Sequence, residues 1–295
     1  MSNILKKSNT PEVIEKIIYA IFLTIGMISV TSVIVITVYL FISGIPAIRE
    51  IGILDFLLGE KWVSTGESPL FGILPFILTS FYGTAIAILI GTPIGILTAV
   101  YVAKLSNRRL KTIVDESVGV LAGIPSVVYG LIGMLVLVPS IKTLFNLSDG
   151  ACLLAASIVL ATMILPSIIK VTITALDSIP EEFETSSLAL GATKIETLFK
   201  VQIPAARSGI VAAIVLGIGR AIGEAMAVMM VSGNVPNMPG MFESVRFLTT
   251  AVASEMAYSQ GLQREALFSI ALVLFLFIMA INISLGIFLK KSKEI

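Results

Sequence analysis

Long apolar runs separated by shorter polar stretches dominate the sequence. A helix needs roughly 20 mainly apolar residues to cross about 30 Å of hydrocarbon, and its backbone must satisfy its own hydrogen bonds there. Six runs have this length, and each predicts a membrane-spanning helix. The first is longer than the apolar region of a signal peptide and has no convincing cleavage site, so it also counts as a span. The runs cover residues 17–42, 74–103, 118–138, 152–175, 210–232 and 266–289.

The Lys and Arg residues predict the orientation of these spans, because positive charge is retained on the cytoplasmic side. Fourteen of the 20 gather before the first span, around the second and fourth connections, and after the last span. An even number of spans places both termini on one side, so we expect both to be cytoplasmic. The predicted organisation is a cytoplasmic segment 1–16, a first helix with a long outer loop 17–73, a five-span core 74–289 and a cytoplasmic tail 290–295.

Two outer connections are long enough to carry structure of their own. The segment 43–71 contains Gly, Pro, acidic residues and Trp62, and the segment 233–265 begins with the turn-rich stretch GNVPNMPG. Both are expected to be ordered excursions outside the membrane. For the first, the alternative is a simple spacer with Trp62 as an interfacial anchor.

Closely spaced glycines occur in the second, third and fifth spans. The pairs are Gly91 and Gly95, Gly119 and Gly123, and Gly219 and Gly223, each four residues apart. This spacing lets helix backbones approach one another, and generic helix packing is sufficient to explain it.

Composition supports a membrane protein and excludes several kinds of chemistry. Hydrophobic residues make up 56% of the chain and charged residues 13%, against about 25% charged in soluble domains. The net charge of +1 gives no basic field for nucleic acid. There is no His and a single Cys, Cys152, so His-based catalysis, a Cys/His zinc site and an internal disulfide are excluded. We therefore expect membrane lipid around the chain, no resident cofactor and no bound metal.

Two charges fall inside the fifth predicted span, in the stretch GIGRAIGEAMAV. Arg220 and Glu224 are four residues apart, which predicts that they share one face of a helix. Arg220 is 13 residues beyond Arg207 at the inner boundary, which corresponds to about 20 Å of helix. A charge at that depth costs at least about 2.5 kcal/mol, so both side chains are expected to face water or the protein interior. They line or gate a path, or alternatively form an ion pair that only locks the helix into the bundle.

Arginine in this position favours an anionic substrate. Its guanidinium stays protonated and offers a planar fork of donors that suits a tetrahedral oxyanion, and Glu224 is expected to hold it between transport events. Binding must remain weak enough for release. No GxxxxGK[ST] phosphate loop is present, so the energy comes from an ion gradient or from a separate ATPase.

The inner loop, residues 176–207, is too long for a simple turn. Pro180 followed by Glu181 and Glu182 predicts the start of a short helix, and a second short helix is expected over 194–201, after Gly191. Two helices joined at a glycine make a rigid projection whose apolar side fits a partner's groove. That side is predicted to hold Leu188, Leu190 and Leu198. The alternative is a helix lying at the lipid interface, with Lys194 and Lys200 facing the headgroups.

The inner loop resembles the signature loop of binding-protein-dependent ABC importer permeases. Its sequence, PEEFETSSLALGATKIETLFKVQIPAARSGI, has Gly191 at the helix–helix turn and Ile203 and Pro204 at the end. Where that family usually has Glu-Ala-Ala, this chain has Thr185, Ser186 and Ser187, with Glu184 next to them. The resemblance implies ATPase contacts at Glu184, Thr185, Ser186, Ser187, Leu188, Leu190, Gly191, Ala192, Lys194, Leu198 and Lys200.

Further segments are similar to the phosphate permease subunits of the PstC type. They are FGILPFILTSFYGT, LAGIPSVVYGLIG and GIGRAIGEAMAVMMVSGN. The resemblance implies an all-α, six-span type I ABC importer permease of the inner membrane that catalyses no reaction itself, with a path or gate role for Arg220 and Glu224. It also implies a second permease subunit of the PstA type, an ATPase dimer of the PstB type and an extracytoplasmic phosphate-binding protein of the PstS type.

Three other functions are weighed against phosphate import. A sulfate or molybdate permease would transport a similar tetrahedral dianion, although only protonated phosphate can also donate a hydrogen bond. An ion-coupled secondary transporter predicts inverted repeats, and the sequence has no convincing one. A membrane-embedded enzyme lacks His and paired intramembrane carboxylates.

Overall fold

The computed structural model of the chain describes residues 10–64 and 68–293. The predicted cytoplasmic segment 1–16 lies mostly outside these residues, as does the end of the predicted tail 290–295. Helices form almost all of the described chain, and the strands within it are the short antiparallel pair β1 (Trp62–Val63) and β2 (Leu70–Phe71). The predicted all-α class is confirmed.

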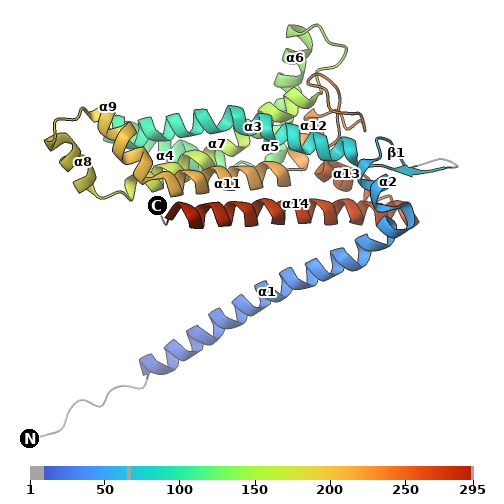
Figure 1. The fold of residues 1–295 in the computed structure, drawn as a ribbon, viewed down its shortest axis with the longest axis horizontal. Coiled ribbons are helices and arrows are strands. Elements are labelled where there is room, and N and C mark those ends of the chain that lie inside the picture. Colours follow the sequence, from blue (N-terminus) through green and yellow to red (C-terminus); the bar gives the residue numbers. More distant parts are fainter. Residues whose placement is uncertain (1–9, 65–67, 294–295) are drawn as a thin grey trace, which may run out of the picture.

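The spans form an elongated bundle (Figure 1). Within the described residues, five helical stretches are long and apolar enough to cross a membrane: Ile14–Ile51, Leu74–Leu105, Ser126–Leu144, Leu153–Asp177 and Gly261–Ser284. A sixth span results when Lys194–Ala205 and Arg207–Gly223 are counted together across a 67° bend. This agrees with the six predicted spans. The long helices are α1 (Thr10–Ile51), α3 (Leu74–Val100) with its π-helical extension η1 (Tyr101–Leu105), α7 (Leu153–Asp177), α11 (Arg207–Gly223) and α14 (Gly261–Lys293).

Helix α7 lies at the centre of the bundle and packs against α3 and α11. A Cβ atom on Gly91 or Gly95 of α3 would lie 2.9 or 2.8 Å from Ile164 or Ile168 of α7, so this glycine pair permits the close helix contact. Nothing within 4 Å would meet a Cβ at Gly119, Gly123, Gly219 or Gly223. These two pairs are therefore not used for packing within the described chain.

Helix α1 leaves the bundle at an angle (Figure 1). Its outer end packs on α14, where Tyr39 meets the edge of Phe268 at 5.5 Å between ring centroids and Ala47 is buried. The apolar side chains from Ile14 to Val35 are exposed. Within a membrane, this surface is covered by lipid or by another chain.

The predicted span 118–138 is not one helix. Helix α4 (Arg108–Gly123) ends before Ile124, whose backbone is extended, and α5 (Ser126–Ile132) begins after Pro125. Proline has no N–H to donate and disfavours helical geometry in the residue before it, which explains the break. The second half of this span continues through π-helical η2 (Gly133–Leu137) into α6 (Val138–Leu144).

The predicted span 210–232 is also interrupted. Helix α11 ends at Gly223, Glu224 is extended with ψ 128°, and α12 (Met226–Val231) follows. The outer halves of the two broken spans pack together, since a Cβ on Gly130 of α5 would lie 2.8 Å from the Cα of Ala227 on α12. Non-helical backbone at membrane depth is tolerated only inside protein or beside a water-filled cavity.

Within the described residues, both outer segments carry secondary structure of their own, although α1 extends into the first of them as far as Ile51. The first contains α2 (Ile53–Leu58) and the β hairpin, and the second contains α13 (Leu248–Glu255). Glu255 joins them, because its carboxylate accepts hydrogen bonds from Trp62 Nε1 at 3.3 Å and Gln263 Nε2 at 3.0 Å and pairs with Arg246. Trp62 is only 5% exposed, so the alternative of an interfacial anchor is wrong.

Candidate functional site

Arg220 lies three residues before the end of α11 and is half-buried. Its Nη1 atom donates to Ser167 Oγ on α7 at 3.3 Å, a long and therefore weak hydrogen bond. The guanidinium therefore lies where α11 and α7 approach one another, about 20 Å of helix beyond Arg207.

Glu224 does not share a helix face with Arg220, so the predicted geometry is wrong. The helix ends at Gly223, and the extended backbone of Glu224 turns its side chain toward α12, where Oε1 accepts from Ala227 N at 3.0 Å. Its carbonyl oxygen accepts from Thr249 Oγ1 of α13 at 2.7 Å. Among the described residues no ion pair joins Arg220 to Glu224, which also removes the locking ion pair proposed as the alternative.

This arrangement leaves most of the Arg220 guanidinium available to a ligand. The group has five N–H donors, and its hydrogen bond within the described chain is the one to Ser167. The open faces at Gly219 and Gly223 adjoin it on the same helix end. A cation with spare donors beside small residues can accept an oxyanion without displacing a bulky side chain.

The inner loop has the predicted form of two short helices joined at a glycine. Helix α8 (Glu181–Ala189) begins after Pro180 with three acidic residues in its first turn, and Gly191 follows with a φ of +88°. Helix α9 (Lys194–Thr197) continues through π-helical η3 (Leu198–Gln202) into α10 (Ile203–Ala205). Figure 1 places α8 and α9 together at one end of the bundle.

A capping box fixes the start of α9. Thr193 Oγ1 accepts from Glu196 N at 3.2 Å, and the Glu196 carboxylate accepts from Thr193 N and Oγ1, both at 3.0 Å. The hydrogen bond from the Thr193 backbone, assisted by its hydroxyl and by the Lys200 charge, lowers the pKa of Glu196. The ion pair with Lys200, at 3.6 Å, is largely exposed.

Some of the predicted ATPase-contact residues make contacts within the loop, and the others are half-buried or exposed on its surface. Ser187 Oγ lies 2.9 Å from Thr197 Oγ1 and joins α8 to α9, and Gln202 Nε2 of η3 donates to Glu184 of α8 at 2.7 Å. The others are half-buried at Leu188 and Ala192 and exposed at Thr185, Ser186, Leu190, Gly191, Lys194 and Lys200.

The prediction that Leu198 belongs to the exposed apolar side of the loop is wrong. It is 2% exposed and packs in a core with Leu176 and Ile210, because the π-helical turn directs it toward the spans. The exposed apolar side chains include Leu190, which is 90% exposed. The sequence reasoning missed three further members, Phe183, Ile195 and Phe199. Their large apolar side chains in a charged segment were the available signal.

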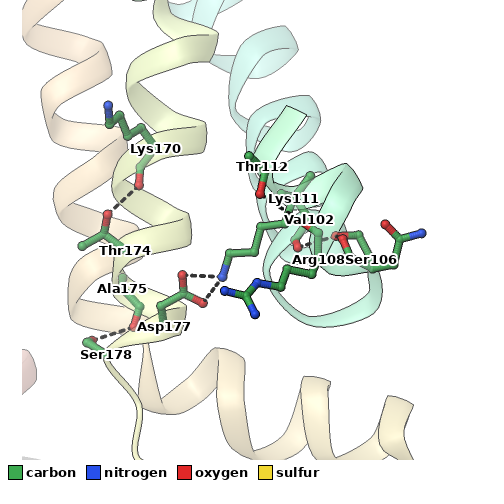
Figure 2. A network of polar contacts seen from close by, with 11 residues as sticks. Val102, Ser106, Arg108, Lys111, Thr112, Lys170, Thr174, Ala175, Asp177 and Ser178 are labelled. Carbon is green, nitrogen blue, oxygen red and sulfur yellow. Dashed lines mark hydrogen bonds and ion pairs between the residues drawn. The ribbon is translucent and has the colours of Figure 1, made fainter. Parts of the chain in front are cut away.

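An ion pair joins the inner end of α7, where the inner loop begins, to α4 in the preceding span. Figure 2 shows the Lys111 ammonium of α4 between the two carboxylate oxygens of Asp177, the last residue of α7, at 2.8 and 2.7 Å. Both side chains are more than a third exposed, so the pair contributes little to stability by itself. Lys170 lies in the last third of α7, inside the predicted span 152–175 and toward its inner end.

Comparisons with known proteins show the family of the chain. The family model "Binding-protein-dependent transport system inner membrane component" matches residues 91–293. The chain is 38% identical over 266 residues to the probable ABC transporter permease protein YqgH of Bacillus subtilis, covering 87% of this chain and 86% of that protein. It is 33% identical over 261 residues to the phosphate transport system permease protein PstC of Mesorhizobium japonicum, covering 81% and 79%.

A solved structure supports the fold. An inward-facing form of the MetNI methionine ABC transporter aligns with a TM-score of 0.57 and 20% identity, covering 75% of this chain and 94% of that chain. The apolar helices and the family match establish a multi-pass inner-membrane protein. The chain belongs to the family of binding-protein-dependent transport system inner membrane components, among the ABC permeases of the PstC type.

Proposed function

We propose that this chain is the permease subunit of an ATP-driven importer that passes inorganic phosphate into the cell, and that Arg220 is the cation that the anion meets on its path. The observation that carries the proposal is the Arg220 guanidinium, half-buried deep in a span with one weak hydrogen bond to Ser167. Relatives of this chain, such as PstC of Mesorhizobium japonicum, are named as phosphate transport permeases.

The energetics favour a hydrated path at Arg220. A charge at bilayer depth costs several kcal/mol unless it is paired or faces water, and no carboxylate pairs with it among the described residues. Phosphate oxygens can replace the weak Ser167 contact with stronger charge-assisted hydrogen bonds. Release inward then requires that the site change as the helices move, so that binding stays transient.

Glu224 acts at the gate rather than as a direct partner of Arg220. It lies at the break between α11 and α12 and is tied to α13 through Thr249. A residue in extended backbone between two helices is a place where rotation of one half relative to the other is least costly. Movement of α12 there would open or close the path beside Arg220.

Energy reaches the path through partner subunits. The chain has no phosphate loop, so ATP is hydrolysed by a PstB-type ATPase dimer that contacts the inner loop. The exposed Leu190 and its apolar neighbours fit a groove on that partner, and the fixed connection of α8 to α9 and η3 transmits its movement. A PstA-type permease completes the path, and a PstS-type binding protein delivers phosphate to the outer side. The charge distribution supports cytoplasmic termini.

A competition assay tests the substrate. The complex, reconstituted in vesicles with its binding protein, is expected to accumulate labelled phosphate only with ATP, and excess unlabelled phosphate should abolish the signal while sulfate and molybdate leave it unchanged. If sulfate but not phosphate competes, the phosphate assignment is wrong. Accumulation by this chain alone without ATP would instead support a secondary transporter.

A further inference from the structure

Helix α7 carries a polar stripe on one side. Its members are spaced by three, four and three residues, which places them within an arc of about 80° on a helix. The residues beside them, including Ile168, Ile169 and Ile173, are buried in the bundle. The polar stripe consists of Ser167, Lys170, Thr174 and Asp177.

The polar stripe begins at the Arg220 guanidinium and runs to the inner end of the span. Ser167 accepts from Arg220, and Asp177 ends α7 where the inner loop begins. Lys170 is three residues from Ser167 and seven from Asp177, so its backbone lies about 4.5 Å inward of Ser167 and about 10 Å before the helix end. It is the next cation after Arg220 along this line.

Among the described residues, the Lys170 ammonium group has no polar partner. It is exposed, and within the described part of the chain its Nζ atom makes no hydrogen bond or ion pair. Figure 2 shows its side chain directed away from the pair formed by Lys111 and Asp177, with Thr174 one turn along the same helix. An exposed ammonium group without a partner in the described chain keeps its three N–H donors available to a ligand.

We propose that Lys170 is a second anion station, which receives the oxyanion from Arg220 and passes it to the cytoplasm. This inference rests on the proposed function and adds a residue to that path. Residues three apart on a helix have Cβ atoms about 5–6 Å apart, so an anion held near Ser167 is within reach of the flexible lysine side chain. The two cations suit successive steps. The arginine fork binds two oxygens of the anion, whereas the strongly hydrated lysine ammonium releases its ligand readily.

The carboxylate of Asp177 at the inner end of the polar stripe does not repel the departing anion, because its charge is neutralised by Lys111. Asp177 would repel a departing anion if its charge were free, but Lys111 lies 2.7 Å from its carboxylate. The ion pair has no net charge and is partly exposed at the inner end of α7. An anion leaving Lys170 therefore passes a neutral pair rather than an unpaired carboxylate.

Charge removal with a matched control tests the station. Lys170→Gln is expected to lower the maximal rate of phosphate uptake about tenfold, as loss of one charged hydrogen bond predicts, without changing the KM for the loaded binding protein. Lys142→Gln, the same change at an exposed lysine of α6, should leave uptake unchanged, and Lys170→Arg should keep most of it. If Lys170→Gln transports as well as Lys142→Gln in a complex whose wild type is active, the station is absent. Failure of the wild type to import phosphate would refute the proposed function instead.

Charge restoration separates transport from folding. In a Cys152→Ala background, Lys170→Cys is modified before reconstitution with an aminoethyl methanethiosulfonate, which restores a cation, or with the neutral methyl reagent. We expect the cationic adduct alone to recover uptake, even if Lys170→Gln assembles poorly. Equal uptake with both adducts, or a thiol that neither reagent reaches, would refute the station.

Discussion

The Arg220 guanidinium on α11 donates to the Ser167 hydroxyl on α7 across 3.3 Å. The contact links two spans at a depth where an unpaired charge is costly, yet it is too long to satisfy a guanidinium. This combination explains how a permanent cation can be held in position and still be free to bind a passing anion.

The Glu224 carboxylate is predicted to stabilise the first turn of α12 through its bond to Ala227 N. Glu224→Ala removes this cap, which costs about 1 kcal/mol and should speed hydrogen exchange in that turn about fivefold. Glu224→Gln keeps an acceptor oxygen and should exchange nearly as slowly as the wild type. Hydrogen exchange measured by mass spectrometry on the purified complex checks this, and equal protection in the Ala variant would show that the contact does not form.

The spans were readable from the sequence, whereas the breaks within them were only partly readable. The length of an apolar run is a local property of the sequence, so each of the six runs corresponds to a helical span in the structure. Pro125 was a visible signal for the first break. The second break follows Gly223 inside a continuous apolar run, and its extended backbone depends on tertiary contacts such as that between Glu224 and Thr249.

Individual side chains in the site were harder to place for the same reason. Arg220 was identifiable because a charge inside an apolar run is anomalous in any fold. Leu198 was placed on the exposed side because its burial depends on a π-helical turn that short-loop periodicity does not encode.

Leu190 and Leu198 offer a matched pair of substitutions in the inner loop. Leu190→Ala changes a side chain that is 90% exposed, so folding should be unaffected while affinity for the ATPase falls about tenfold, the effect of losing one buried apolar contact. Leu198→Ala creates a cavity and should destabilise the loop by about 2–5 kcal/mol.

ATPase binding to the permease in nanodiscs and protease sensitivity of the loop separate these effects. Leu190→Ala should alter only the first measurement, and Leu198→Ala should alter the second. Wild-type ATPase affinity in Leu190→Ala would argue that this face lies elsewhere, for instance at the lipid interface.

The turn at Gly191 is predicted to require a residue that tolerates positive φ. A Cβ there meets nothing within 4 Å, so only the φ of +88° resists substitution. Gly191→Val should cost about 1–2 kcal/mol and lower the phosphate imported per ATP hydrolysed, whereas Gly191→Asn should retain most of the coupling. Simultaneous measurement of uptake and ATP hydrolysis provides the ratio. A Val variant with unchanged coupling would contradict a rigid connection between α8 and α9.

The capping box predicts a specific pH dependence for α9. Because folding lowers the pKa of Glu196 below 4.5, its contribution is fully present above that value and is lost as the pH falls through the lowered pKa. Exchange protection of residues 193–198, corrected for intrinsic rates, should therefore be constant near neutral pH and fall in strong acid. Glu196→Gln should abolish the change. Loss of protection near neutral pH would mean that another group controls the turn.

The central claim is that Arg220 faces the substrate path, and one uptake measurement tests it most directly. With Arg220→Gln in an otherwise intact, ATPase-bound complex, we predict that ATP-driven phosphate uptake falls about ten- to a hundredfold, the loss expected for charged hydrogen bonds to the anion. The matched change Arg264→Gln, at the outer start of α14, should leave uptake unchanged. Uptake by Arg220→Gln equal to that of Arg264→Gln would contradict the account.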